Sequence, residues 1–144
     1  MDIAFSGYKS SCEIASSSFD QLLMAISANC SISKNGAEGD RAEMPEMACL
    51  WFVDELLRSC REVWSEKREV AFNDFYGEYN VVVRPCGEDV ANVEINFADQ
   101  HVDGTLSRQN LQKIGERMLA DLKTSFPEIA SNSAFQKYES TLHA

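Results

Sequence analysis

The sequence predicts an α+β fold in a single domain spanning residues 1–144, with an antiparallel meander of at least three strands packed by two main helices. Residues 46–67 carry apolar side chains at helical spacing, and residues 107–124 do so again. Between them, residues 69–97 contain three runs in which apolar and polar side chains alternate. The links between these runs are short, which indicates antiparallel neighbours, and a chain of 144 residues is long enough for one hydrophobic core.

The helix over residues 46–67 has the clearest pattern. On a helical wheel, Asp54, Glu55 and Arg58 lie on its polar face, and Trp51 projects from the middle of that same face. The opposite side is one wide apolar arc, which indicates packing against a sheet or several helices. The arc consists of Cys49, Leu50, Phe52, Val53, Leu56, Leu57, Cys60, Val63 and Trp64.

Three strands and a second helix follow. The strands are expected over residues 69–75, 78–84 and 90–97, and Tyr76-Gly77 and residues 85–89 supply the turns. The second helix is expected over residues 107–124. Ser107 can cap its first turn, and Phe126-Pro127 ends it.

The remaining segments have weaker patterns. Residues 1–18 allow one or two short strands, and residues 19–30 predict a short helix with Ser18 as its N-cap. Residues 31–45 contain Gly36, Gly39 and Pro45 among polar side chains and predict a flexible loop. Residues 128–144 form a tail in which a short helix over 134–142 is expected either to form or to fray.

Charge and cysteine usage limit the class of protein. There are 23 acidic and 13 basic residues, a net charge of −10, which argues against a nucleic-acid partner and against docking on anionic lipid. It favours a basic partner protein. The sequence contains no run of 18 apolar residues, so we expect no membrane-spanning helix. The cysteines are odd in number and form no CxxC pair, so we expect free thiols in a reduced, monomeric, cytoplasmic protein; they are Cys12, Cys30, Cys49, Cys60 and Cys86.

The sequence offers little for catalysis. His101 and His143 are the only histidines, and no nucleophile-elbow, phosphate-loop or zinc-protease motif occurs, so we expect neither an enzyme nor a cofactor. Asp99, His101 and Asp103 alternate, and in an extended segment their side chains would share one face. Such a set either binds a metal or forms a solvated turn. We favour the turn and expect no metal site.

Trp51 raises the question of a partner surface. A tryptophan on a polar helix face is covered either by another part of the chain, such as residues 31–45 or the N-terminal segment, or by a partner, because tryptophan is enriched at interface hot spots. The acidic side chains spread over helix and turns are either a solvated surface or a complement to a basic protein. The candidate partner-binding residues are Trp51, Asp54, Glu55, Arg58, Glu62, Glu88, Asp89, Asp99 and Asp103.

The order of segments resembles that of a known family. A helix, a strand over 69–75, the runs GEYNVVVRP and VEINFADQ, and a helix that ends in MLADLKTSFP together resemble small immunity proteins of bacterial polymorphic toxin systems, the WapI-type group. The resemblance covers roughly residues 50–127. It implies neutralisation of a cognate toxin by direct binding, with acidic side chains that occlude a basic cleft such as that of a nuclease. It implies no catalytic residues. The alternative is a small acidic secretion chaperone or adaptor.

Overall fold

The structure, a computed structural model, describes residues 1–34 and 41–142. In these residues two antiparallel sheets accompany four α-helices, which confirms the α+β class. One sheet has the strand order β1-β2-β3 and the other β4-β5-β6-β7. The elements in chain order are β1 (Asp2–Ser10), the 3-10 turn η1 (Ile14–Ser16), α1 (Phe19–Ala25), β2 (Ile26–Ser33), β3 (Arg41–Met47), α2 (Cys49–Glu66), β4 (Val70–Asn73), β5 (Tyr79–Pro85), β6 (Val90–Phe97), β7 (Gln100–Ser107), α3 (Arg108–Ser125), the 3-10 turn η2 (Pro127–Ser131) and α4 (Ser133–Leu142).

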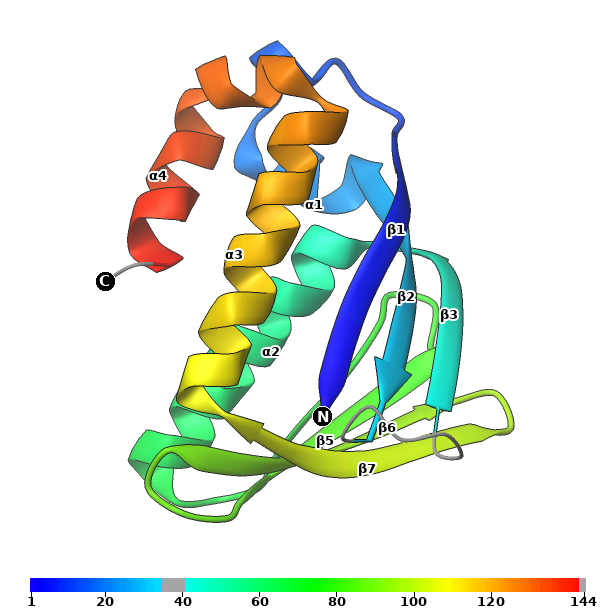
Figure 1. Cartoon of the computed structure of the whole chain (residues 1–144), viewed down its shortest axis with the longest axis vertical. Coiled ribbons are helices and arrows are strands. Elements are labelled where there is room, and N and C mark those ends of the chain that lie inside the picture. The colour runs from blue at the N-terminus through cyan, green and yellow to red at the C-terminus, as the bar shows by residue number, and fades with distance from the viewer. Residues whose placement is uncertain (35–40, 143–144) are drawn as a thin grey trace.

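Figure 1 shows how the layers are arranged. The four-stranded sheet runs across the bottom of the view, and the three-stranded sheet rises at the right. α2 lies behind α3, and α4 lies beside α3 on the outer flank. α2 contacts β2 of one sheet and β4, β5 and β6 of the other, so its apolar face occupies the centre of the core. None of the described helices combines the length and the apolarity needed to cross a bilayer.

The predicted apolar arc of the central helix is confirmed, because all nine of its side chains are buried. The helix begins at Cys49, three residues later than expected. Glu46 has a positive φ of 48°, and Met47 still pairs with Ala28 of β2, so the chain there remains extended. The helix ends where Lys67 turns left-handed, with its N–H donating to the Val63 carbonyl.

The meander contains the three predicted strands and one more. Tyr79 of β5 pairs with Phe97 of β6, which brings the β4–β5 and β6–β7 turns to the same end of the sheet. The turn favoured for Asp99, His101 and Asp103 is correct only for Asp99, because His101 and Asp103 belong to β7, which pairs with β6 along its whole length. Gly104 lies inside this strand, where a Cβ would sit 3.4 Å from the Cβ of Met1.

The expectations for residues 19–45 need two corrections. The helix over 19–30 ends at Ala25, and Ile26 to Ser33 form β2. Its capping residue was predicted correctly: the Ser18 hydroxyl accepts from the backbone N–H of Gln21. The prediction of a flexible loop over residues 31–45 is wrong at both ends, because β2 extends to Ser33 and β3 begins at Arg41. Residues 35–40 lie outside the described residues.

A side chain links the two sheets. The Gln100 amide donates to the Glu43 carbonyl at 3.3 Å and accepts from the Glu43 N–H at 2.8 Å. The Gln100 side chain thus forms with β3 the two hydrogen bonds that a neighbouring strand would form. β3 is the edge strand of its sheet, which also explains why Pro45 is tolerated there. The link fixes β3 against the start of β7 and so shapes the space between the sheets.

Of the two alternatives for the C-terminal tail, the structure shows the short helix: α4 covers Ser133–Leu142, within one residue of the expected 134–142. Asn132 is buried, and its amide donates to the carbonyls of Ile14 and Ser17 at 2.7 and 2.8 Å. Phe135 and Leu142 of α4 are buried against the core. A Cβ at Gly115 would approach Leu142 to 2.9 Å, so the glycine lets α4 lie close to α3.

Candidate functional site

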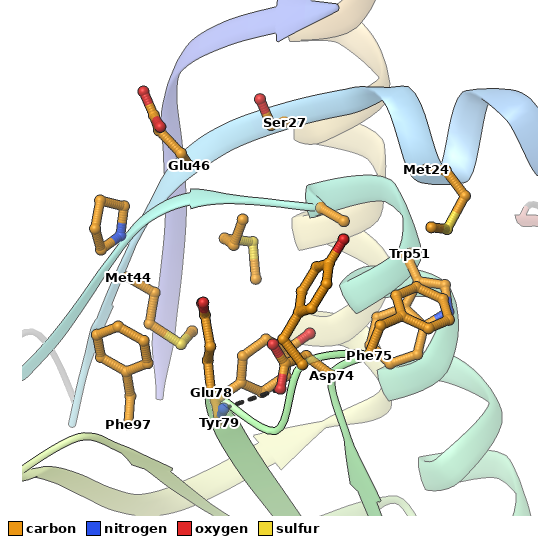
Figure 2. A pocket seen from close by; sticks show the side chains of 14 residues that line it. Met24, Ser27, Met44, Glu46, Trp51, Asp74, Phe75, Glu78, Tyr79 and Phe97 are labelled. Atoms are coloured by element: carbon orange, nitrogen blue, oxygen red, sulfur yellow. Dashed lines mark hydrogen bonds between the residues drawn. The ribbon is translucent and has the colours of Figure 1, made fainter. Parts of the chain in front are cut away.

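The candidate site is a pocket of about 160 Å³ beneath the turn that joins β4 to β5 (Figure 2). It lies between that turn and the corner where β3 enters α2. We call it the hairpin pocket, and we define it by Met24, Trp51, Asp74, Phe75, Tyr76 and Glu78. In Figure 2 Trp51 and Phe75 overlap at one end of the pocket, Phe97 and Met44 lie at the other, and Glu78 stands between them.

Aromatic side chains form much of the wall. The ring of Trp51 lies 4.8 Å from that of Phe75 and 6.1 Å from that of Phe72, measured between ring centroids. Beneath them Phe52 and Tyr79 meet edge to face at 5.7 Å. These distances are typical of aromatic pairs that stabilise one another. The wall of the pocket is therefore built in the free protein, without a partner.

Exposed apolar surface is concentrated at this pocket. Across residues 1–34 and 41–142, three large hydrophobic side chains are strongly exposed: Met24 at 57%, Phe75 at 56% and Tyr76 at 84%. All three line the hairpin pocket. Leaving a large apolar side chain in water forgoes roughly 1.5–3 kcal/mol relative to full burial. A contiguous apolar patch of this kind commonly marks a binding surface.

The charged groups of the pocket all have one sign. Glu46, Asp74 and Glu78 line it, and no Lys, Arg or His of the described residues does. Lys9 approaches from β1 and pairs with Glu46, with 3.0 Å between Nζ and Oε1. The Asp74 carboxylate accepts from the Tyr79 N–H at 3.1 Å. The Glu78 side chain has no hydrogen-bond or ion-pair partner among the described residues, so its charge is available to a ligand.

The turn that carries Phe75 and Tyr76 is held by its own backbone. Gly77 has a φ of +70°, and its N–H donates to the Asp74 carbonyl at 3.2 Å. Burial, followed by the nearby Asp74 carboxylate, raises the pKa of Tyr79, so its phenol stays neutral at physiological pH. Phe75 and Tyr76 thus project from a turn whose backbone is fixed, and the Tyr79 side chain that lines the pocket with them is uncharged.

Trp51 belongs to this site, but its surroundings differ from those predicted. Phe72 and Phe75 cover it from the β4 side, so it is half-buried rather than bare on a polar helix face. The ring contacts that cover it come from β4 and the β4–β5 turn, while Met44 and Pro45 of the 31–45 segment line the same pocket. A helical wheel gives the direction in which Trp51 projects from the helix axis. It does not show that side chains of β4 and the β4–β5 turn pack against that position.

The charged candidates on α2 form ion pairs with arginines of α2 and of the residues that follow it. Arg58 donates to Asp54 at 2.9 Å and to Glu55 at 2.7 Å, and Arg68 pairs with Glu62. The carboxylates of Asp54 and Glu55 are also largely covered, with side chains 16% and 23% exposed. Of the candidates on α2, Trp51 lines the hairpin pocket, and Asp54, Glu55, Arg58 and Glu62 do not.

The acidic turn residues divide between the two ends of the four-stranded sheet. Asp99 is exposed in the β6–β7 turn, at the same end as the hairpin pocket. Glu88 and Asp89 lie in the β5–β6 turn at the other end, roughly 25 Å away across eight residues of β6 at ~3.3 Å each. Asp89 also pairs with Arg108 at 3.0 Å. The acidic turn candidates therefore lie at opposite ends of the sheet, and Asp99 is the one at the end of the hairpin pocket.

Asp99, His101 and Asp103 do not gather around a common point. His101 Nδ1 lies 2.7 Å from the Asn96 amide oxygen, and Asp103 accepts from Asn92 at 2.9 Å. In the part of the chain that the structure describes, no group of three His, Cys, Asp or Glu side chains is arranged to hold a metal ion. His143 lies outside that part.

The residues that sequence reasoning missed are Met24, Phe75, Tyr76 and Glu78. A signal was present: Phe75 and Tyr76 are two adjacent aromatics at a turn, where polar residues are usual. Met24 carried no signal, because it comes from α1 and meets the pocket only through the packing of α1 beside α2. The comparisons add no further evidence: no protein-family model, curated protein or solved structure matches this chain.

The five cysteines should differ sharply in reactivity. Burial raises the pKa of Cys49 and Cys60 to about 12, and it raises that of Cys30 as well. Cys86 is exposed and Cys12 half-buried. With a thiol reagent at pH 8, the native protein should lose Cys86 first, while Cys30, Cys49 and Cys60 react only after unfolding. Unfolding without reductant should release five thiols, and a smaller number would reveal a disulfide.

Trp51→Ala should lower the free energy of unfolding by about 2 kcal/mol, because the half-buried indole packs on two phenyl rings. Urea denaturation measures this change. Trp51→Phe keeps an aromatic ring at the site and should cost less than half as much. If both variants match the wild-type stability, the packing of Phe72 and Phe75 on Trp51 contributes nothing to the fold.

Proposed function

We propose that this protein neutralises a toxin by binding it directly, as an immunity protein does, and that the hairpin pocket is the centre of the binding surface. One observation supports the proposal above all: the three strongly exposed large hydrophobic side chains of the described residues converge on one pocket that carries only acidic charge. An aromatic centre with a charged rim is the usual anatomy of a protein interface.

The charge of the whole chain supports a basic partner. The net charge of −10 raises the rate at which a basic protein meets this one. Glu78 and Asp99 are exposed at the pocket end of the sheet, whereas the α2 candidates Asp54, Glu55 and Glu62 are paired with arginines. A nuclease domain, which needs a basic cleft to hold its substrate, has the required chemistry.

The mixed lining of this surface favours a folded partner over the alternative of a secretion chaperone. A chaperone needs a long apolar groove for an unfolded segment, whereas the hairpin pocket is about 160 Å³ and is rimmed by carboxylates. The larger, more open space of about 700 Å³ that shares Met44, Pro45 and Phe97 with it is also lined by polar side chains, among them Asn29, Glu43 and Gln100. The patch is also preformed, since its aromatic wall and its turn are held by internal contacts.

The test is to express the protein encoded directly beside this gene, with and without this chain. If the proposal is right, the neighbour inhibits growth when expressed alone, growth returns with this chain, and the two proteins elute together at a mass of one copy each. A neighbour that is harmless alone and depends on this chain for its secretion, with this chain a dimer by light scattering, would contradict the proposal and favour the chaperone.

A further inference from the structure

We infer that the hairpin pocket receives one cationic side chain, a lysine or an arginine, of the partner. The inference deepens the proposed function and rests on it for the identity of the partner, but the chemistry of the pocket can be tested without that partner. Three features of the pocket support it: its size, its aromatic faces and its unpaired carboxylate.

The size fits the end of one long side chain. A cavity of about 150 Å³ holds a benzene ring, and the hairpin pocket measures about 160 Å³. A helix or a strand is too wide for the pocket itself, although it could lie in the more open space of about 700 Å³ that shares Met44, Pro45 and Phe97 with the pocket. The occupant is therefore a single side chain that projects from the partner, while the exposed faces of Phe75 and Tyr76 contact the surface around it.

The lining favours a cation over an apolar occupant. An apolar side chain would remove water from the Glu78 carboxylate and give it no partner in return, which is costly. A lysine or arginine supplies that partner through a charge-assisted hydrogen bond and presents its positive charge to the aromatic faces. Trp51, the best aromatic group for this contact, forms one end of the pocket (Figure 2).

One of the carboxylates at the rim of the pocket already has a cationic partner from this chain. Lys9 already reaches Glu46, with Nζ 3.0 Å from Oε1, and both side chains are about 70% exposed. Glu78 has no such partner among the described residues and stands between the two aromatic ends of the pocket. It is therefore the carboxylate most directly placed to engage an incoming cation.

The experiment uses the two tryptophan indoles as probes. The full chain labelled with ¹⁵N gives one indole N–H signal from Trp51, in the pocket, and one from Trp64, which is buried at the far end of α2 and serves as an internal reference. The protein is titrated at physiological salt with hexa-arginine, with hexa-lysine and with the neutral apolar probe acetyl-leucine amide. We expect the Trp51 signal to shift and saturate with one or both cationic peptides, the Trp64 signal to stay fixed, and the leucine probe to have no effect.

Two matched variants separate the pocket from general charge attraction. Glu78→Gln removes one charge at the pocket, and Glu88→Gln removes the same charge in the exposed turn at the other end of the sheet. Glu78→Gln should raise the dissociation constant for the cationic peptides at least tenfold, and Glu88→Gln should change it less than twofold. Equal weakening by both variants, a Trp51 shift with the leucine probe alone, or no Trp51 shift with either cationic peptide would each overturn the inference.

The proposed function can fail separately. If the cationic peptides bind as expected while the neighbouring gene's product does not bind, the pocket has its predicted chemistry and the toxin proposal is wrong. If the neighbour's product binds Glu78→Gln as tightly as the wild type, the proposed function survives and the inference about the pocket is overturned.

Discussion

Replacing Phe75 and Tyr76 together with alanine should weaken binding of the partner at least 100-fold, or about 3 kcal/mol. Both side chains are largely exposed, at 56% and 84%, at the mouth of the hairpin pocket, so they lose more water in a complex than in folding. Aromatic residues at the centre of a preformed patch contribute most of the binding energy in known interfaces.

The fold should tolerate this double variant. Tyr76 has little to lose, and Phe75 gives up one contact with Trp51, so the free energy of unfolding should fall by about 1 kcal/mol or less. Titration calorimetry with the partner measures the affinity, and urea denaturation measures the stability. Glu88→Ala, at the other end of the sheet, is the control and should bind like the wild type within a factor of two. A double variant of unchanged affinity would exclude the turn from the interface.

Asn132→Ala should lower the free energy of unfolding by about 3 kcal/mol. The buried Asn132 amide donates to the carbonyls of Ile14 and Ser17, and its oxygen accepts from the Phe135 N–H at 3.0 Å. Alanine leaves two carbonyls and one amide in or near the core without partners, and each such group costs roughly 1 kcal/mol or more. The residue joins the N-terminal segment to α4 across more than a hundred positions of sequence.

A matched control stands at the preceding position. The Ser131 hydroxyl donates only to the Glu128 carbonyl within the same exposed turn, so Ser131→Ala should cost less than about 0.5 kcal/mol. Urea denaturation of both variants gives the comparison. Equal losses would mean that the Asn132 hydrogen bonds do not hold the tail in place.

The sequence predicts those parts of the fold in which apolar residues recur at one spacing, helical or alternating, over a whole element. The apolar arc of α2 extends over five turns, and β5 and β6 alternate cleanly, so their burial follows from the residues alone. β2 shows the opposite case. Ile26, Ala28, Cys30 and Ile32 alternate and are buried, yet Ile26 and Cys30 are also four residues apart and extend the helical spacing of α1. Pairing with β1 on one side and β3 on the other decides in favour of the strand.

β7 and the tail could not be predicted because their contacts come from distant parts of the chain. β7 presents only Val102, Gly104 and Leu106 to the interior, and the glycine is explained by the approach of Met1. Asn132 looks like an ordinary turn residue until the carbonyls of the N-terminal segment are placed around it. Neither signal is periodic or local.

The candidate site divides in the same way. Trp51 could be singled out because it breaks the helical pattern, whereas its grouping with Phe75, Tyr76 and Met24 depends on how the β4–β5 turn and α1 pack against α2. The acidic candidates follow from their place beside Trp51 on the helical wheel or in turns, and ion pairs with Arg58, Arg68 and Arg108 occupy several of them. Sequence spacing does not reveal which carboxylate has a nearby arginine.

The central claim, that the hairpin pocket is the surface that meets the partner, is tested most directly by site-specific photocrosslinking. A benzophenone amino acid is placed at Tyr76, and in a separate protein at Glu88, which lies in the exposed turn at the other end of the sheet. Both proteins are irradiated in complex with the product of the neighbouring gene. The account predicts a crosslinked species of the two chains from position 76 and none from position 88. A crosslink from position 88 with none from position 76 would contradict it.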